Sequence, residues 1–179
     1  MKKILLVLVV LLLLGWLIWL LNSAKPVVYQ PVILSENNDI TNTTIWTYLD
    51  TVVSVGLDEL DVKGTPVLIQ PMNERMRSRF ESSEGMELEA YIAEWMEGYT
   101  ICVNKDLGRS RAIEIMAHEL LHLAQYQKGR LVVGNTTEVL WLGVPYDVLQ
   151  MTYNERPWEQ EAFAQQADLA RRIRLQLLP

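Results

Sequence analysis

His118, Glu119 and His122 form the pattern His-Glu-x-x-His. On an α-helix, residues four apart lie on one face, so the two imidazoles can converge on one Zn²⁺ ion, and Glu119 beside them can act on a water that the ion binds. His118 and His122 are also the two histidines of the whole sequence. The pattern therefore predicts a metal site on a helix, and the elements around it must supply the rest.

The sequence predicts that this motif lies in a helix from Ser110 to about Lys128. Ser110 is a favoured N-cap residue, and Gly129 stands where helices commonly end. At 100° per residue, apolar residues fill one arc of the helix: Ile113, Met116, Ala117, Leu120, Leu121 and Ala124. The adjoining arc holds the motif residues and an aromatic residue: His118, Glu119, His122 and Tyr126. Two histidines at this spacing are often only surface residues, and the glutamate directly after the first one favours a metal site.

Two histidines do not complete a catalytic zinc site, which commonly has three protein ligands and one open position. Cys102 lies upstream in a predicted strand, so the third ligand should be an Asp or Glu from a separate element. A helix that begins at Pro157, a favoured first helical residue, supplies candidates. Its acidic start, with Glu159 and Glu161, and its basic end at 171–174 also suit the helix dipole, so these glutamates have an ordinary structural explanation as well.

The sequence resembles the gluzincin branch of the His-Glu-x-x-His zinc metallopeptidases, particularly the small single-domain type of bacteria and phages. Two segments carry the resemblance, which covers roughly residues 86–175: HELLHLAQY at 118–126 and RPWEQEA at 156–162. The resemblance implies a small zincin-like α+β domain that uses zinc to hydrolyse peptide bonds. It also implies that Glu119 is the general base and that a peptide or protein is the substrate.

In that family a helix with Glu-x-x-Ala-Asp, or a close variant, supplies the third metal ligand. The match implies Glu159, three residues before Ala162, as that ligand. Glu161 is the second choice, and Glu155, which precedes the helix, is the third. Phe163 occupies the position where the family usually has Asp or Asn to hold a ligand histidine by a hydrogen bond, so another residue must hold it here.

Larger gluzincins use a further histidine to stabilise the transition state, and this chain has none left. Tyr146, Tyr153 or Arg156 could take that role. We also expect the strand at 99–104, just before the motif helix, to present its edge to an extended peptide, as in related peptidases.

The spacing of apolar and turn-forming residues outside the motif helix predicts one α+β domain at 26–179 with a short mixed sheet. Apolar residues at helical spacing predict a helix at 43–57, and the charged, unpatterned segment 73–85 predicts a surface loop. Strands are predicted at 26–34, 65–70, 88–95, 99–104, 131–133 and 139–144. The strands at 88–95 and 99–104 are predicted to form a hairpin, because Glu97-Gly98 lies between them.

An uncharged, almost wholly apolar run occupies residues 4–21. As a helix it is about 27 Å long, which is enough to cross a hydrocarbon core of about 30 Å. Lys2 and Lys3 before it favour a cytoplasmic N-terminus. We therefore expect residues 1–25 to be a single-pass membrane anchor, with the domain on the extracytoplasmic side. Signal cleavage after Ala24, which would release a secreted protein, is the alternative.

Charge and cysteine content narrow the functional classes further. Three of the 16 basic residues (Lys2, Lys3 and Lys25) precede every acidic residue, which leaves 13 basic against 22 acidic residues, a charge of −9, after Lys25. So acidic a domain lacks the basic surface of a nucleic-acid binder. Cys102 is the single cysteine, so the chain forms no internal disulfide. A catalytically inactive anchored domain that binds a partner through the same helix remains the alternative to an enzyme.

Overall fold

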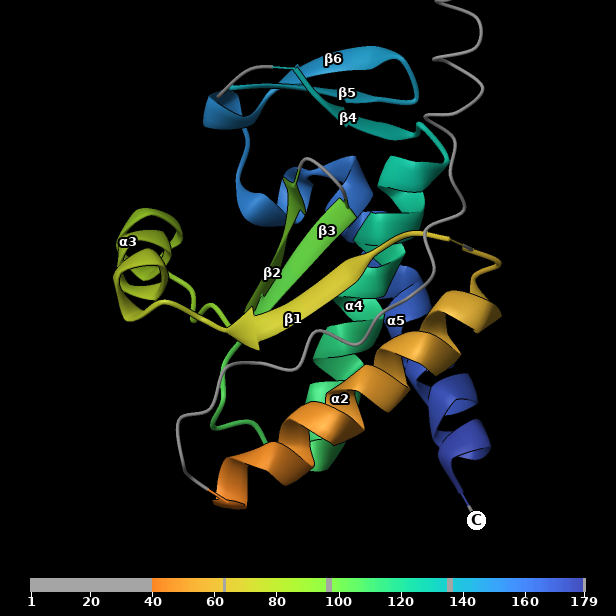
Figure 1. The fold of residues 1–179 in the computed structure, drawn as a ribbon. Helices are drawn as coiled ribbons and strands as arrows, with labels where there is room; N and C mark the ends of the chain where they lie inside the picture. Colours follow the sequence, from red (N-terminus) through yellow and green to blue (C-terminus); the bar gives the residue numbers. More distant parts are fainter. Residues whose placement is uncertain (1–39, 63, 96–97, 135–136, 179) are drawn as a thin grey trace, which may run out of the picture.

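The computed structural model describes residues 40–62, 64–95, 98–134 and 137–178, and Figure 1 shows their arrangement. The helices are α2 (Ile40–Glu59), α3 (Glu74–Glu84), α4 (Arg109–Gln127) and α5 (Pro157–Leu177), with short 3₁₀ helices η1 (Val148–Gln150) and η2 (Tyr153–Glu155). The strands are β1 (Val67–Pro71), β2 (Ala90–Trp95), β3 (Gly98–Val103), β4 (Leu131–Val133), β5 (Glu138–Trp141) and β6 (Val144–Asp147). The predicted α+β class is confirmed.

Within this described part of the chain, no helix is both long and apolar enough to cross a membrane. The membrane helix predicted at 4–21 and the strand predicted at 26–34 lie outside the described residues.

The first sheet has the order β1-β3-β2 and is mixed, as predicted. Strand β1 runs parallel to β3, with Ile69 opposite Ile101, and β2 runs antiparallel to β3, with Ile92 also opposite Ile101. Strand β3 is therefore central, and the prediction that it presents an edge to a peptide is wrong. The outer strands of this sheet, among the described residues, are β1 and β2. The hairpin signal predicts the pairing of β2 with β3, but local sequence carries no signal that β1 joins β3 on its other side.

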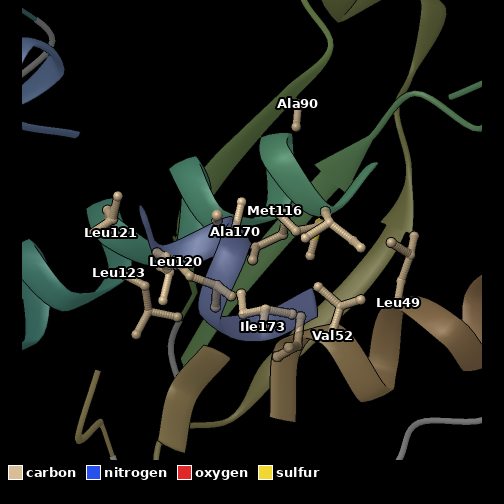
Figure 2. Packing of buried hydrophobic residues seen from close by; sticks show 14 of the residues in the cluster. Leu49, Val52, Ala90, Met116, Leu120, Leu121, Leu123, Ala170 and Ile173 are labelled. Carbon is tan, nitrogen blue, oxygen red and sulfur yellow. The ribbon is translucent and has the colours of Figure 1, made fainter. Parts of the chain in front are cut away.

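Helices α2, α4 and α5 pack together on one side of this sheet (Figure 1). The side chains between them are apolar and fully or almost fully buried (Figure 2): Leu49, Val52, Met116, Leu120, Leu123, Ala170 and Ile173. Gly56 allows α2 to approach α4 closely, because an added Cβ there would overlap the side chain of Leu120. This packing fixes α4 and α5 relative to each other, and these two helices carry the predicted site.

The segment 73–85 is helix α3, so the predicted surface loop is wrong. Asn73 caps the helix by accepting a hydrogen bond from the backbone N–H of Arg75 at 2.8 Å, and Gly85 ends it in a left-handed conformation with φ 67°. Arg77 and Glu81, one turn apart, form an ion pair at 2.9 Å. Caps and charge pairs stabilise a largely exposed helix without an apolar stripe, and such a stripe is the signal on which the prediction depended.

Helix α4 begins one residue before the predicted start. Its N-cap is Gly108, so Ser110 lies inside the helix and does not cap it. The Ser110 backbone oxygen accepts instead from Arg174 of α5 at 3.1 Å. The predicted end is confirmed, because Gly129 follows the last turn with φ 62°.

The second sheet, with the order β4-β5-β6, is antiparallel and lies beyond the hairpin end of β2 and β3 (Figure 1). Its inner face buries Leu131 and Trp141 against Trp158 of α5. The strand predicted at 139–144 is two strands, because Leu142 and Gly143 form a turn with φ values of 53° and 81°. A leucine with positive φ is uncommon, so residue type gave no sign of this turn.

Candidate metal centre

Helices α4 and α5 bring His118, His122 and Glu159 together. The Nε2 atoms of the two histidines lie 3.0 Å apart. Glu159 Oε2 lies 3.1 Å from His118 Nε2 and 3.0 Å from His122 Nε2. All three residues are buried, with exposed fractions of 5 to 6%. Their ligand atoms all lie within 4.8 Å of one another, so this group could hold a metal ion.

The donor atoms fit a metal ion in their chemistry and in their direction. Each imidazole turns its Nε2 inward, while its Nδ1 contacts a glutamine: His118 with Gln166 Oε1 at 3.2 Å and His122 with Gln125 Oε1 at 2.8 Å. Metal-binding histidines commonly form such a second hydrogen bond, which fixes the ring. Gln166 thus holds His118, whereas the Phe163 ring lies against that imidazole, with centroids 4.6 Å apart.

The charges within this group stabilise one another. Burial raises the pKa of Glu159, but hydrogen bonds with His118 and His122 and the charge of His122 outweigh burial and hold the pKa well below its ordinary value. Burial lowers the pKa of His122, but hydrogen bonding to Glu159 and the charge of that carboxylate raise it above its ordinary value. The carboxylate is therefore ionised in the folded protein, as a metal ligand must be.

Glu119 lies beside the metal group and points into a cavity. Burial raises the pKa of its carboxyl group, against the opposing effect of His122, His118 and a hydrogen bond from the backbone N–H of Ile92, and the net pKa lies above its ordinary value. A carboxylate with a raised pKa is better matched to accepting a proton near neutral pH.

The cavity has a volume of about 130 Å³ and lies between the metal group and strand β2. Glu119, His122 and Glu159 form its polar side. The other lining residues, mostly apolar or aromatic, are Phe80, Leu88, Ala90, Tyr91, Ile92, Tyr126, Leu131, Tyr153 and Trp158. Phe80 comes from α3, so the helix that the sequence did not predict forms part of the cavity wall.

The outer edge of β2 borders this cavity. The N–H of Ile92 bonds to Glu119, so this backbone group points away from β3 and toward the site. Backbone groups two residues away along β2 point the same way, and within the described residues β3 is the one strand that pairs with β2.

Tyr153, in η2, places its hydroxyl at the metal group. The oxygen lies 3.5 Å from His118 Nε2, and the hydroxyl also bonds to Glu159. Burial strongly raises the pKa of Tyr153, so the group stays protonated and can donate. Arg156 lies with its guanidinium carbon 5.2 Å from the centre of the Tyr153 ring. Tyr146 packs instead against Trp158, with ring centroids 6.0 Å apart, and does not line the cavity.

The other two candidate carboxylates lie away from the histidines. Glu161 accepts hydrogen bonds from Gln125 at 3.0 Å and from Arg130 at 2.6 Å. Glu155 accepts from the backbone N–H and the hydroxyl of Thr152, both at 2.8 Å. Residues two apart on a helix face different directions, which is why Glu161 does not accompany Glu159.

Sequence reasoning did not identify Gln125, Gln166, Phe80 or Ile92 as residues of the site. The contact of Gln125 with His122 could have been predicted, because residues three apart on one helix are neighbours. Phe80 and Ile92 are brought to the site by tertiary packing, which local sequence does not reveal.

A scan of the chain against models of protein families finds no match, and searches among curated proteins and among solved structures find none either.

Proposed function

We propose that the chain is a zinc-dependent peptidase. The observation that carries this proposal is the buried group of His118, His122 and Glu159 with a further carboxylate, Glu119, in the adjoining cavity. Two imidazoles and one carboxylate are a common ligand set for catalytic zinc, with a fourth position left open. Zinc, when bound, supplies Lewis acidity, which lowers the pKa of water at the open position and polarises a carbonyl group.

The residues of the chain have separate roles in this proposal. Glu119 accepts a proton from the attacking water and delivers it to the leaving amine, which its raised pKa favours. The Tyr153 hydroxyl donates to the negative charge that develops on the carbonyl oxygen. The outer edge of β2 binds the peptide backbone as an added strand, which aligns it along the cavity.

Glu119→Gln tests the catalytic part of the proposal. The amide keeps the shape of the side chain but cannot accept the proton, so we expect zinc content to be unchanged and hydrolysis of a peptide library to fall by roughly 10²-fold or more. Glu114→Gln is the matched control: it makes the same change on the same helix, and Glu114 does not line the cavity.

Full hydrolysis by Glu119→Gln would contradict the assigned mechanism. A wild-type chain that binds zinc but hydrolyses no peptide would instead favour the alternative, an inactive anchored domain that binds a partner. The anchor at 1–25 places the active domain on the extracytoplasmic side in this proposal, and the mass of the mature N-terminus distinguishes an anchor from a cleaved signal.

A further inference from the structure

We propose that Gln125 is a positioning residue that fixes His122 for metal binding, and that Glu161 and Arg130 fix Gln125 in turn. This inference rests on the metal site proposed above. Glu161 then acts on the metal position through Gln125 and His122, although it is not placed to be a ligand itself.

The orientation of the Gln125 amide follows from its partners. Gln125 is buried, with an exposed fraction of 3%. Its Nε2 atom contacts the backbone oxygen of Trp158 and the carboxylate of Glu161, both at 3.0 Å. A carbonyl and a carboxylate only accept hydrogen bonds, so the NH₂ group must face them. The amide oxygen must then face His122.

This orientation decides which nitrogen of His122 carries the hydrogen. The amide oxygen of Gln125 lies 2.8 Å from His122 Nδ1, and it can only accept. Nδ1 must therefore donate, which leaves the lone pair of Nε2 free for a metal ion once the ring is neutral. Nε2 is the nitrogen that faces Glu159, at 3.0 Å. Without Gln125, the hydrogen could move to Nε2 and block that ligand position.

Glu161 and Arg130 connect this arrangement to the second sheet. Arg130 donates to Glu161 at 2.6 Å, and its guanidinium carbon lies 4.9 Å from the centre of the Trp141 ring in β5. Trp141 is buried against Trp158, whose backbone oxygen also holds Gln125. The second sheet thus packs against both α5 residues that hold the amide of Gln125, Trp158 directly and Glu161 through Arg130.

The test is a nitrogen NMR measurement on the full chain, loaded with zinc and labelled with ¹⁵N in histidine. Two imidazoles give signals, and two-bond proton–nitrogen correlations identify the protonated nitrogen of each. We expect His122 to carry its hydrogen on Nδ1. In Gln125→Leu the Nδ1–H group of His122 loses its acceptor, so its proton signal should shift and exchange faster with water, and the dissociation constant for zinc should rise by about 10- to 100-fold.

Three variants make this result specific. Gln165→Leu changes an exposed glutamine of α5 and should alter neither the spectrum nor zinc affinity. Glu161→Leu removes one of the two acceptors of the Gln125 NH₂ group and should raise the zinc dissociation constant less than Gln125→Leu. Gln125→Glu keeps an acceptor for His122 but sets a carboxylate oxygen against the acceptors of Trp158 and Glu161, so it should also raise the zinc dissociation constant.

Unchanged zinc affinity and an unchanged His122 signal in Gln125→Leu would overturn this inference and leave the metal site intact. If Gln125→Leu does not fold, as judged by circular dichroism, the same readouts on Glu161→Leu decide the question. A wild-type chain that binds no zinc would overturn both this inference and the proposed function.

Discussion

Glu159 differs from the nearby carboxylates in the partners it has in the folded chain. It lies between two imidazole nitrogens at 3.0 to 3.1 Å, whereas Glu155 caps a turn and Glu161 pairs with Arg130. The spacing to Ala162 already favoured Glu159 through the family resemblance, and the structure places it with His118 and His122. The glutamine partners of the histidines were not predictable from that resemblance.

Glu159→Gln should abolish tight zinc binding. The substitution removes the anionic ligand and leaves two imidazoles, which do not make a three-ligand site. The measurement is zinc content after dialysis, together with the zinc dissociation constant by calorimetry. Glu155→Gln is the control and should retain one equivalent of zinc. Loss of zinc in Glu155→Gln but not in Glu159→Gln would show that the third ligand is assigned wrongly.

Tyr153→Phe should lower kcat by roughly 10²-fold while zinc content and KM stay nearly unchanged, because the lost hydroxyl acts mainly on charge that develops in the transition state. Steady-state kinetics on one cleaved peptide measures this. Tyr146→Phe removes a hydroxyl from a tyrosine that packs on Trp158 outside the cavity, and should have little effect on kcat. Equal losses in the two variants would argue against a catalytic role for Tyr153.

Among the elements, those with a strong apolar pattern were predicted well. The helices at α2, α4 and α5 and the hairpin of β2 with β3 follow from periodicity and turn residues. Helix α3 was missed because caps and ion pairs stabilise it, and the central place of β3 was missed because β1 joins it from far along the chain. The edge strand beside the site therefore could not be identified before the sheet order was known.

Gly98, the first residue of β3, lies very close to the backbone of Pro66, the residue before β1. An added Cβ at Gly98 would overlap the backbone oxygen of Pro66, which accepts a hydrogen bond from Tyr99 at 2.9 Å. A backbone atom cannot move aside as a flexible side chain does, so Gly98→Ala should reduce the free energy of unfolding by about 1–3 kcal/mol. Urea denaturation measures the change. Gly134→Ala places its Cβ no closer than 3.4 Å to its nearest neighbour, Glu138, and should change stability by no more than a few tenths of a kcal/mol.

At the scale of the whole molecule, the proposed metal joins two helices that already pack against each other. Helix α4 carries two ligands and α5 carries the third, and both share the core formed with α2. Metal binding to this arrangement favours the folded state, since the unfolded chain does not hold the three groups together.

Removal of zinc should therefore lower the thermal stability of the protein. With free zinc at 100 times its dissociation constant, binding contributes about 2.7 kcal/mol, which corresponds to a Tm change of roughly 5–10 °C for a chain of this size. Thermal unfolding with and without a chelator measures it. His118→Ala should show no chelator effect, and an equal effect in that variant would place the stabilising metal elsewhere.

The most direct test of the proposed zinc site is a crystal structure of the zinc-loaded chain with anomalous data collected at the zinc absorption edge. We expect one strong peak at bonding distance, about 2.0–2.2 Å, from His118 Nε2, His122 Nε2 and a carboxylate oxygen of Glu159, with Glu119 beside it. A zinc ion bound by Glu161 or Glu155 in place of Glu159, or no zinc at the two histidines, would contradict it.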